Sequence, residues 1–173
     1  MPSTEEKLVI VTGAARGIGL ATAKLFNENG FKVAIVDKDK NEITKLSILN
    51  NDIRTFCYDI SNYDSIDKMF KNILKWHNRI DVLVNNAGVA DFGKIEATDL
   101  NRWNDVMRTN LDGAFMCSQK SISHLKKTRG CIINIASISG LRASTLRVAY
   151  GTSKAAIIQL TKQQAAELGE YGI

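Results

Sequence analysis

The chain has 173 residues, of which 45% are hydrophobic and 24% are charged, proportions that are typical of a globular protein. No run approaches the roughly 20 apolar residues of a membrane span, and residues 1–6 are polar, without the apolar stretch of a signal peptide. The net charge is +5, but the basic residues are not clustered with aromatic residues, as they are on nucleic-acid-binding surfaces. We therefore expect one cytoplasmic domain over residues 1–173 that binds neither nucleic acid nor membrane.

Cysteine and histidine are too sparse and too scattered to predict a metal centre. The three cysteines, Cys57, Cys117 and Cys131, show no Cys-x-x-Cys spacing, and the two histidines are isolated. This usage is typical of unpaired cysteines in a reducing cytosol.

Short apolar, β-branched runs alternate along the chain with longer segments of helical periodicity. The runs predicted to be strands are residues 8–12, 32–36, 53–57, 80–84 and 131–135. The segments predicted to be helices are residues 18–29, 40–49, 63–76, 100–127 and 149–168. The alternation predicts an α/β fold, a Rossmann-type doubly wound parallel sheet in three layers with helices on both faces. In such sheets, ligands bind beyond the carboxyl ends of the strands.

A glycine-rich turn follows the first predicted strand and opens the first predicted helix. Its glycines permit a tight turn and a close backbone approach to a pyrophosphate, while the helix N-terminus adds free N–H groups and a favourable dipole. Such a turn can be only a tight loop, but its place between strand and helix favours a nucleotide. The predicted cofactor contacts are Gly13, Ala15, Arg16, Gly17, Ile18 and Gly19.

Acidic residues follow the next two predicted strands. Asp37 lies eighteen residues after Gly19, where a carboxylate can accept hydrogen bonds from both ribose hydroxyls of an adenosine. It would repel a 2′-phosphate, so we expect NAD rather than NADP, although Arg16 could pair with such a phosphate. Asp59, which precedes Ile60, could bind the adenine amino group or could be an N-terminal residue of the next helix.

The last two strand ends carry small and polar residues. Asn86, Ala87 and Gly88 follow the fourth predicted strand, where we expect them to contact the cofactor. Ser137 and Ser139 follow the fifth strand and compete for a position facing the substrate.

Tyr150 and Lys154 lie four residues apart in the last predicted helix, a spacing that places both side chains on one face. At ~4 Å and an effective dielectric constant of ~20, the lysine charge would stabilise an ionised phenol by about 4 kcal/mol. The same spacing is common in solvated pairs on surface helices, so the pair alone does not identify a site.

Together these motifs resemble those of the short-chain dehydrogenase/reductase family, from about Lys7 to the last residue. The resemblance rests on Thr12-Gly-x-x-x-Gly17-x-Gly19, Asn85-Asn-Ala-Gly88, Asn110, Ser137 and Tyr150-x-x-x-Lys154, in this order. It implies an NAD(P)-dependent oxidoreductase that acts on alcohols and ketones and assembles as a homo-dimer or tetramer.

The resemblance also implies roles for individual residues. Tyr150 would be the general acid/base, and Lys154 would favour its ionised form and hold the nicotinamide ribose, so that both residues also contact the cofactor. Ser137 would donate a hydrogen bond to the substrate oxygen, at the family's spacing of thirteen residues from Tyr150. Asn110 would help to hold a water that relays protons to solvent.

The residues around Asn110 leave its role open. An amide beside a buried apolar stripe must find hydrogen-bond partners, so Asn110 could bridge backbone groups, which is compatible with holding a water. The apolar stripe that we expect beside it consists of Leu100, Trp103, Met107, Leu111 and Ala114.

Members of the family continue beyond this point with a sixth strand, a nicotinamide-contacting loop, a substrate-covering segment and a seventh strand. We therefore expect a truncated version of the fold that lacks the last two strands and leaves the fifth as an apolar edge. A cofactor-binding module without catalysis and an assembly subunit are the alternatives to an active enzyme.

Basic residues are unevenly distributed along the chain. Residues 113–166 contain eight lysines or arginines and no aspartate or glutamate, whereas the rest of the chain has 15 basic and 18 acidic residues. A solvated basic face and a site for an anionic ligand would both explain this asymmetry. The identity of the substrate does not follow from the sequence.

Overall fold

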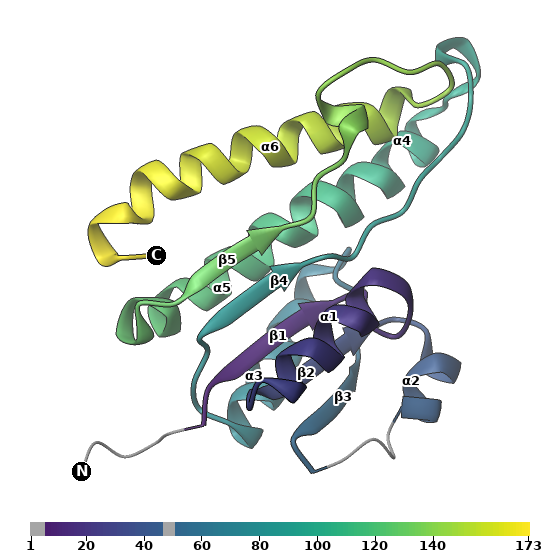
Figure 1. The fold of residues 1–173 in the computed structure, drawn as a ribbon. Coiled ribbons are helices and arrows are strands. Elements are labelled where there is room, and N and C mark those ends of the chain that lie inside the picture. Colours follow the sequence, from purple (N-terminus) through teal and green to yellow (C-terminus); the bar gives the residue numbers. More distant parts are fainter. Residues whose placement is uncertain (1–5, 47–50) are drawn as a thin grey trace.

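The computed structural model describes residues 6–46 and 51–173 and is built around one parallel β-sheet (Figure 1). Neighbouring strands pair in parallel in the order β3-β2-β1-β4-β5. Because the chain moves outward from β1 to β3 and then returns to the other side of β1, the switch point lies between β1 and β4, where doubly wound sheets bind ligands. The strands are β1 (Leu8–Thr12), β2 (Lys32–Asp37), β3 (Ile53–Cys57), β4 (Val82–Asn85) and β5 (Cys131–Asn134).

The helices form a layer on each face of the sheet, which confirms the three-layer α/β prediction. α1 and α2 cover one face, α3 and α5 cover the other, and α6 packs alongside α4 (Figure 1). In the described part of the chain, no helix combines the length and the apolar character needed to cross a bilayer. The helices are α1 (Gly17–Glu28), α2 (Lys40–Leu46), α3 (Tyr63–Trp76), α4 (Leu100–Met107), α5 (Gly113–Thr128) and α6 (Val148–Leu168).

α3 illustrates why these segments form helices on the sheet. The side chain of Asn62 caps its N-terminus by accepting a hydrogen bond from the backbone N–H of Ser65 at 3.0 Å. Burying each large apolar side chain of its inner face contributes about 1.5–3 kcal/mol. These buried residues recur at three- and four-residue spacing: Ile66, Met69, Phe70 and Ile73.

The sheet separates two apolar clusters, one beneath α1 and α2 and the other beneath α3 and α5. β1 contributes to both, because Leu8 and Ile10 point into the second cluster while Val9 and Val11 point into the first. Burial on both faces explains why this strand is apolar throughout instead of alternating with polar residues.

The predicted helical run over residues 100–127 is present, since the backbone is helical from Leu100 to Thr128, but a π-helical segment that was not predicted, Arg108–Asp112, lies between α4 and α5. The predicted apolar stripe is wrong at its start, since Leu100 is 76% exposed. Asp99 caps α4 by accepting a hydrogen bond from the backbone N–H of Arg102, so Leu100 lies in the first turn, outside the packed part of the helix.

Other boundaries differ by a few residues. The strand predicted over residues 80–84 is β4, which begins only at Val82 and extends to Asn85. The end of the helix predicted over residues 40–49 lies outside the described residues. Short 3₁₀ segments that were not predicted occur at Ile95–Ala97, Ile138–Gly140 and Gly169–Tyr171.

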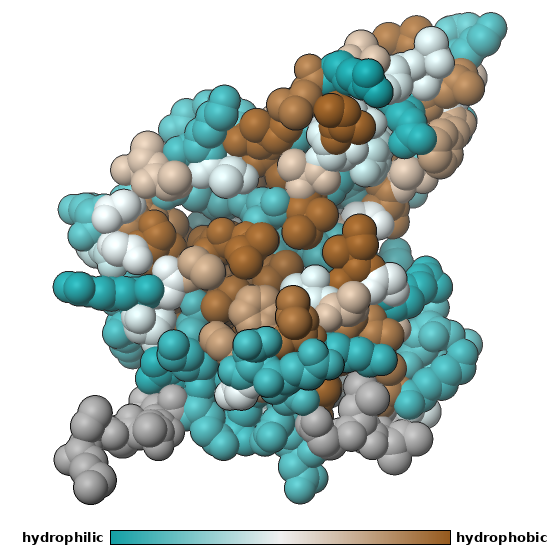
Figure 2. Space-filling model, viewed as in Figure 1, coloured by the Kyte–Doolittle hydropathy of each residue, from teal (hydrophilic) through white to brown (hydrophobic). Residues whose placement is uncertain are grey.

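β5 forms an edge of the sheet, as predicted, and one of its faces is uncovered. Ile132 packs into the cluster beneath α3 and α5, so its neighbours Cys131 and Ile133 point to the opposite face. There Cys131 is exposed and Ile133 is 39% exposed. Apolar side chains gather on this face of the molecule (Figure 2).

Candidate active site

The glycine turn between β1 and α1 packs tightly against the end of β4. Gly13 has a φ of +62°, and a Cβ atom there would lie 2.6 Å from the Cα of Ala87. No side chain caps the N-terminus of α1 at Arg16, so the first N–H groups of this helix are available to a ligand. The turn therefore presents backbone donors and a helix dipole, which suit an anion.

Thr12 and Asn86 join this turn to β4. The Thr12 hydroxyl accepts hydrogen bonds from the backbone N–H groups of Asn86 and Ala87, both at 3.1 Å. The side-chain amide of Asn86 donates to the carbonyls of Thr12 at 2.9 Å and Gly13 at 3.0 Å. Asn86 and Ala87 were predicted to lie at the site. Thr12 opens the glycine motif in the sequence, but its role in joining the turn to β4 was not predicted.

Asp37 is held rigidly at the end of β2. One carboxylate oxygen accepts a hydrogen bond from the backbone N–H of Ala15 at 3.1 Å, and the other accepts one from Asp39 at 3.0 Å. Arg16 pairs with Asp39 at 3.7 Å instead of with Asp37. The fixed carboxylate therefore faces the cavity with free lone pairs, as a ribose-binding group would.

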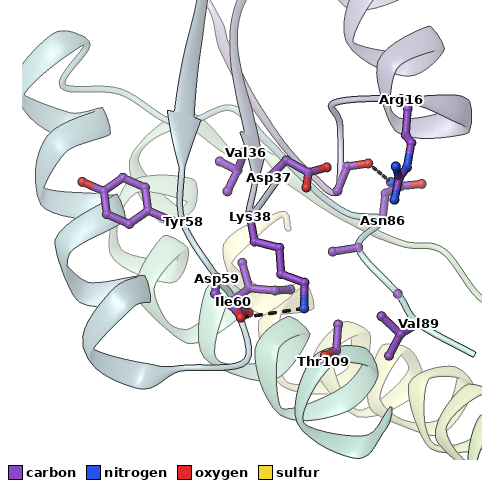
Figure 3. Close-up of a pocket in the computed structure, with 13 residues that line it drawn as sticks. Arg16, Val36, Asp37, Lys38, Tyr58, Asp59, Ile60, Asn86, Val89 and Thr109 are labelled. Atoms are coloured by element: carbon purple, nitrogen blue, oxygen red, sulfur yellow. Dashed lines mark hydrogen bonds and ion pairs between the residues drawn. The ribbon is translucent and has the colours of Figure 1, made fainter. Parts of the chain in front are cut away.

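Asp59 and Ile60 lie on the opposite wall of the same cavity. Asp59 accepts hydrogen bonds from the backbone and hydroxyl of Ser61, at 2.9 and 2.8 Å. Lys38 extends across the cavity toward its other carboxylate oxygen, at 3.8 Å (Figure 3). Because Asn62 is the N-cap of α3, Asp59 is not itself that cap.

One cavity thus brings together most of the predicted cofactor residues from β1, β2, β3 and β4 (Figure 3). Ala15, Gly17, Ile18 and Gly19 belong to the adjoining turn but do not line it. The predicted residues that line the cavity are Gly13, Arg16, Asp37, Asp59, Ile60, Asn86, Ala87 and Gly88.

Tyr150 and Lys154 lie on one face of α6, as their spacing predicts. The Lys154 Nζ atom is 5.9 Å from the centroid of the Tyr150 ring and donates a hydrogen bond to the carbonyl of Ile135 at 2.6 Å. Lys154 is only 5% exposed, and burial lowers the pKa of its ammonium group. A Cβ atom on Gly88 would lie 3.6 Å from Nζ, so this lysine borders the cavity lined by Gly88.

Asn110 lies in the π-helical segment and links the end of β4 to α6. Its side-chain oxygen accepts a hydrogen bond from the backbone N–H of Val89 at 2.8 Å. Its amide donates to the Val89 carbonyl at 2.9 Å and to the Ser153 hydroxyl at 3.0 Å. Ser153 in turn donates to the carbonyl of Tyr150 at 2.7 Å. Asn110 therefore bridges backbone groups, and a role in holding a relay water stays a prediction.

Ser153 was not among the residues predicted from the sequence, although it is buried beside Lys154 and lies three residues after Tyr150. Its hydroxyl accepts a hydrogen bond from Asn110 and donates one to the carbonyl of Tyr150. Ser153 therefore connects Asn110 to the turn of α6 that carries the phenol. The sequence Tyr150-x-x-Ser153-Lys154 was the signal that could have identified it.

Ser137 and Ser139 take different positions after β5. Ser137 caps the 3₁₀ segment Ile138–Gly140, and its side chain accepts a hydrogen bond from Ser139 N at 3.2 Å. A Cβ atom on Gly140 would lie 2.6 Å from the backbone carbon of Lys154, so this loop packs directly on α6. Ser139 lines a second groove, outside the cavity that contains the predicted cofactor residues.

Comparison with known proteins identifies the family. A family model for short chain dehydrogenases matches residues 7–173. The meso-2,3-butanediol dehydrogenase of Serratia marcescens is 34% identical over 171 residues, which span 98% of this chain and 68% of that protein. The structure of 4-hydroxyisoleucine dehydrogenase complexed with NADH has a TM-score of 0.90 and 33% identity, over 97% of this chain and 70% of that one.

A third comparison agrees with these two. The structure of 3-ketoacyl-(acyl-carrier-protein) reductase from Brucella melitensis, also complexed with NADH, has a TM-score of 0.93 and 28% identity, over 98% of this chain and 73% of that one. Since the family model covers nearly the whole chain and the motifs lie where that fold needs them, this protein belongs to the short-chain dehydrogenase/reductase family of oxidoreductases.

Proposed function

We propose that this protein is an NAD-dependent oxidoreductase that interconverts a secondary alcohol and a ketone. The observation that carries the proposal is the junction of two features at Gly88. This residue lines the cavity at the carboxyl ends of the strands, and it also borders the buried ammonium group of Lys154, beside Tyr150.

The residues present fit a nicotinamide dinucleotide. The uncapped first turn of α1 would hold the pyrophosphate, and the fixed carboxylate of Asp37 would accept hydrogen bonds from the adenosine ribose. Lys154 is a buried ammonium that has one carbonyl partner and no described carboxylate within ion-pair distance, so it retains donors for the second ribose.

In the proposed mechanism, a nicotinamide bound in this cavity would supply the hydride acceptor for oxidation of the alcohol. Tyr150 in its ionised form takes the proton of the substrate hydroxyl, and returns it when a ketone is reduced. The charge of Lys154 stabilises the ionised phenol, and Ser137 donates a hydrogen bond to the substrate oxygen. Asn110 and Ser153 hold the turn of α6 that carries Tyr150.

Replacing the phenol tests this mechanism. We expect Tyr150→Phe to lower kcat by about a hundredfold or more, because general acid–base catalysis typically contributes that much. NADH formation from a panel of secondary alcohols, followed at 340 nm, measures the loss, while fluorescence titration with NADH checks that the cofactor still binds. Tyr63→Phe, at an exposed position of α3 that does not line the cavity, is the matched control. Equal turnover by the two variants would reject the role of Tyr150.

Preference for NAD over NADP rests on Asp37. We expect Asp37→Ser to weaken NADH binding about tenfold or more and to leave NADPH binding unchanged or stronger, because the carboxylate repels a 2′-phosphate. Separate fluorescence titrations with NADH and NADPH measure both affinities. Asp64→Asn, on the exposed side of α3, controls for the loss of one negative charge. Parallel losses for the two cofactors would count against the NAD preference.

A second candidate function is cofactor binding with little or no turnover, within an assembly of subunits. The uncovered apolar face of β5, with Ile133 39% exposed, favours it, because an uncovered face beside the site suits a partner chain. NADH binding without oxidation of any secondary alcohol would support this alternative. Sedimentation velocity would test the homo-dimer or tetramer that we propose for either function.

Residence in the cytoplasm is part of the proposal as well. The cysteines Cys57, Cys117 and Cys131 are all unpaired in the structure, which suits a reducing compartment.

A further inference from the structure

Arg147 lies directly beside the proposed catalytic tyrosine. It is the N-cap of α6, three residues before Tyr150. Its guanidinium carbon is 5.7 Å from the centroid of the Tyr150 ring and 4.7 Å from the centroid of the Phe92 ring. The guanidinium therefore packs against two aromatic rings, one of which carries the reacting hydroxyl.

In the part of the chain that the structure describes, residues 6–46 and 51–173, no carboxylate forms an ion pair with Arg147. Two acidic residues of the loop after β4 have other partners, since Asp91 pairs with Arg102 at 2.6 Å and Glu96 pairs with Lys94 at 3.9 Å. Contacts with ring faces leave the edge N–H groups of a guanidinium free to bind an oxyanion in a bidentate manner.

Two loops hold this arginine in place. The backbone N–H of Gly93 donates a hydrogen bond to the Leu146 carbonyl at 3.1 Å, and a parallel bridge joins Gly93 to Arg147. Arg102 anchors the first loop by donating to the carbonyls of Phe92 at 3.1 Å and Ala97 at 3.0 Å. The loops that follow β4 and β5 therefore pair with each other and form one wall. Backbone pairing and ring contacts together hold Arg147 in this wall.

A groove adjoins this wall, because Gly93, Leu146 and Arg147 are among the residues that line it. Arg142, Ser139 and Thr152 line it as well. All of its lining residues except Gly93 and Ile95 belong to residues 113–166, where there are eight basic and no acidic residues. A local excess of positive charge raises the concentration of anions at such a surface.

We propose that Arg147 determines substrate specificity by binding an oxyanion, a carboxylate or phosphate, that the alcohol or ketone substrate carries near its reacting carbon. The inference rests on the proposed function, because it assumes that Tyr150 exchanges a proton with that substrate. The short separation of the guanidinium from the Tyr150 ring implies a small substrate, in which the anionic group and the hydroxyl are close together.

Matched substrate pairs test the inference on the full chain. We expect kcat/KM for 3-hydroxybutanoate to exceed that for its neutral amide by about tenfold or more, or kcat/KM for glycerol 1-phosphate to exceed that for glycerol by as much. Whichever pair responds identifies the oxyanion. Arg147→Met should abolish the difference while leaving NADH affinity unchanged, and Arg147→Lys should restore part of it. Lys162→Gln, which removes an exposed charge from the same helix, should behave like the wild type.

A binding measurement separates the failure of this inference from the failure of the proposed function. Butanoate and butanamide are titrated calorimetrically into the NADH-loaded protein and into its Arg147→Met variant. If neutral alcohols are oxidised and the wild type and Arg147→Met show the same substrate preference, the inference is overturned and the proposed function stands. If no secondary alcohol is oxidised, the proposed function fails. Butanoate binding that Arg147→Met abolishes would then still support the anion site, and binding that is unchanged would overturn it.

Discussion

Asn110 is only 2% exposed, and each hydrogen-bonding group of its side chain has a partner inside the protein. Val89 follows the end of β4 and, within the described residues, has no helix or strand partner for its backbone. The side chain of Asn110 takes the place of such a partner, because it bonds both the N–H and the carbonyl of Val89. A polar side chain in this position stabilises the protein because it pairs backbone groups that are partly removed from water. Its structural role is therefore separable from any role in proton relay.

Truncating this side chain should have a large effect on stability. We expect Asn110→Ala to lower the free energy of unfolding by about 1–3 kcal/mol, since two partly buried backbone groups of Val89 lose their partner. Thermal unfolding followed by circular dichroism measures the shift. Asn101→Ala, at an exposed position of α4, is the control and should unfold close to the wild-type temperature. If the two variants unfold at the same temperature, the bridging role of Asn110 is not needed for the fold.

The residue types at this site could be predicted, but their contacts could not. The spacing of Tyr150 and Lys154 along a helix fixes their common face, so the sequence was sufficient for that pair. The partners of Asn110 lie 21 and 43 residues away along the chain, at Val89 and Ser153. Contacts over such separations depend on how the helices and strands pack, which no local pattern specifies.

Among the elements, the turn between β1 and α1 carries a strict steric requirement near the cavity. We expect Gly13→Ala to destabilise the protein by about 2–4 kcal/mol, because the new Cβ atom adds a clash with Ala87 to the strain of a positive φ. NADH affinity should fall about tenfold or more, since the turn must move away from β4 to relieve the clash.

Gly30 offers a matched control for this prediction. It has a φ of +80° after the end of α1, but a Cβ atom there would meet nothing within 4 Å. Gly30→Ala should therefore cost only about 1 kcal/mol and leave NADH affinity unchanged. Urea unfolding and fluorescence titration on both variants separate the cost of backbone strain from that of the clash. Equal NADH affinities would show that the turn does not shape the cofactor cavity.

The strands were easier to predict than the π-helical segment of the long helical run. Strands buried on both faces are continuous apolar runs, such as β1, and these are visible in the sequence. The π-helical segment, Arg108–Asp112, preserves the apolar periodicity closely enough that the pattern predicts one unbroken helix. The segment leads directly into Gly113, the first residue of α5. A Cβ atom on Gly113 would lie 2.7 Å from the carbonyl oxygen of Ile60, so the start of α5 packs directly on the loop after β3.

In the molecule as a whole, the sheet divides the interior into two clusters that differ in how completely helices cover them. The cluster beneath α3 and α5 extends under β4 and includes Cys117, which is fully buried. The opposite face is open at β5, where Ile133 and Cys131 are exposed. Both features follow from the strand order, which the alternation of strands and helices does not determine on its own.

The buried thiol of Cys117 should make the stability of the whole protein fall at alkaline pH. Burial raises the pKa of this thiol from 9.0 to about 12. Above pH 9.0 the unfolded chain loses the thiol proton and the folded protein keeps it, so the unfolded state binds fewer protons and is favoured as the pH rises. The destabilisation caused by Cys117 is absent below pH 9.0, where the thiol keeps its proton in both states. It levels off above a pH of about 12, where the thiol is ionised in both states.

Comparison with a variant that lacks the thiol isolates this contribution from other titrating groups. Relative to Cys117→Ala, the free energy of unfolding of the wild type should fall by about 1.4 kcal/mol for each pH unit above 9. Urea unfolding curves at pH 8, 9, 10 and 10.5 measure the difference, and Cys57→Ala, which removes an exposed thiol, controls for the substitution itself. A difference that does not change with pH would mean that Cys117 is accessible to water in the folded protein, and that the cluster beneath α5 opens in solution.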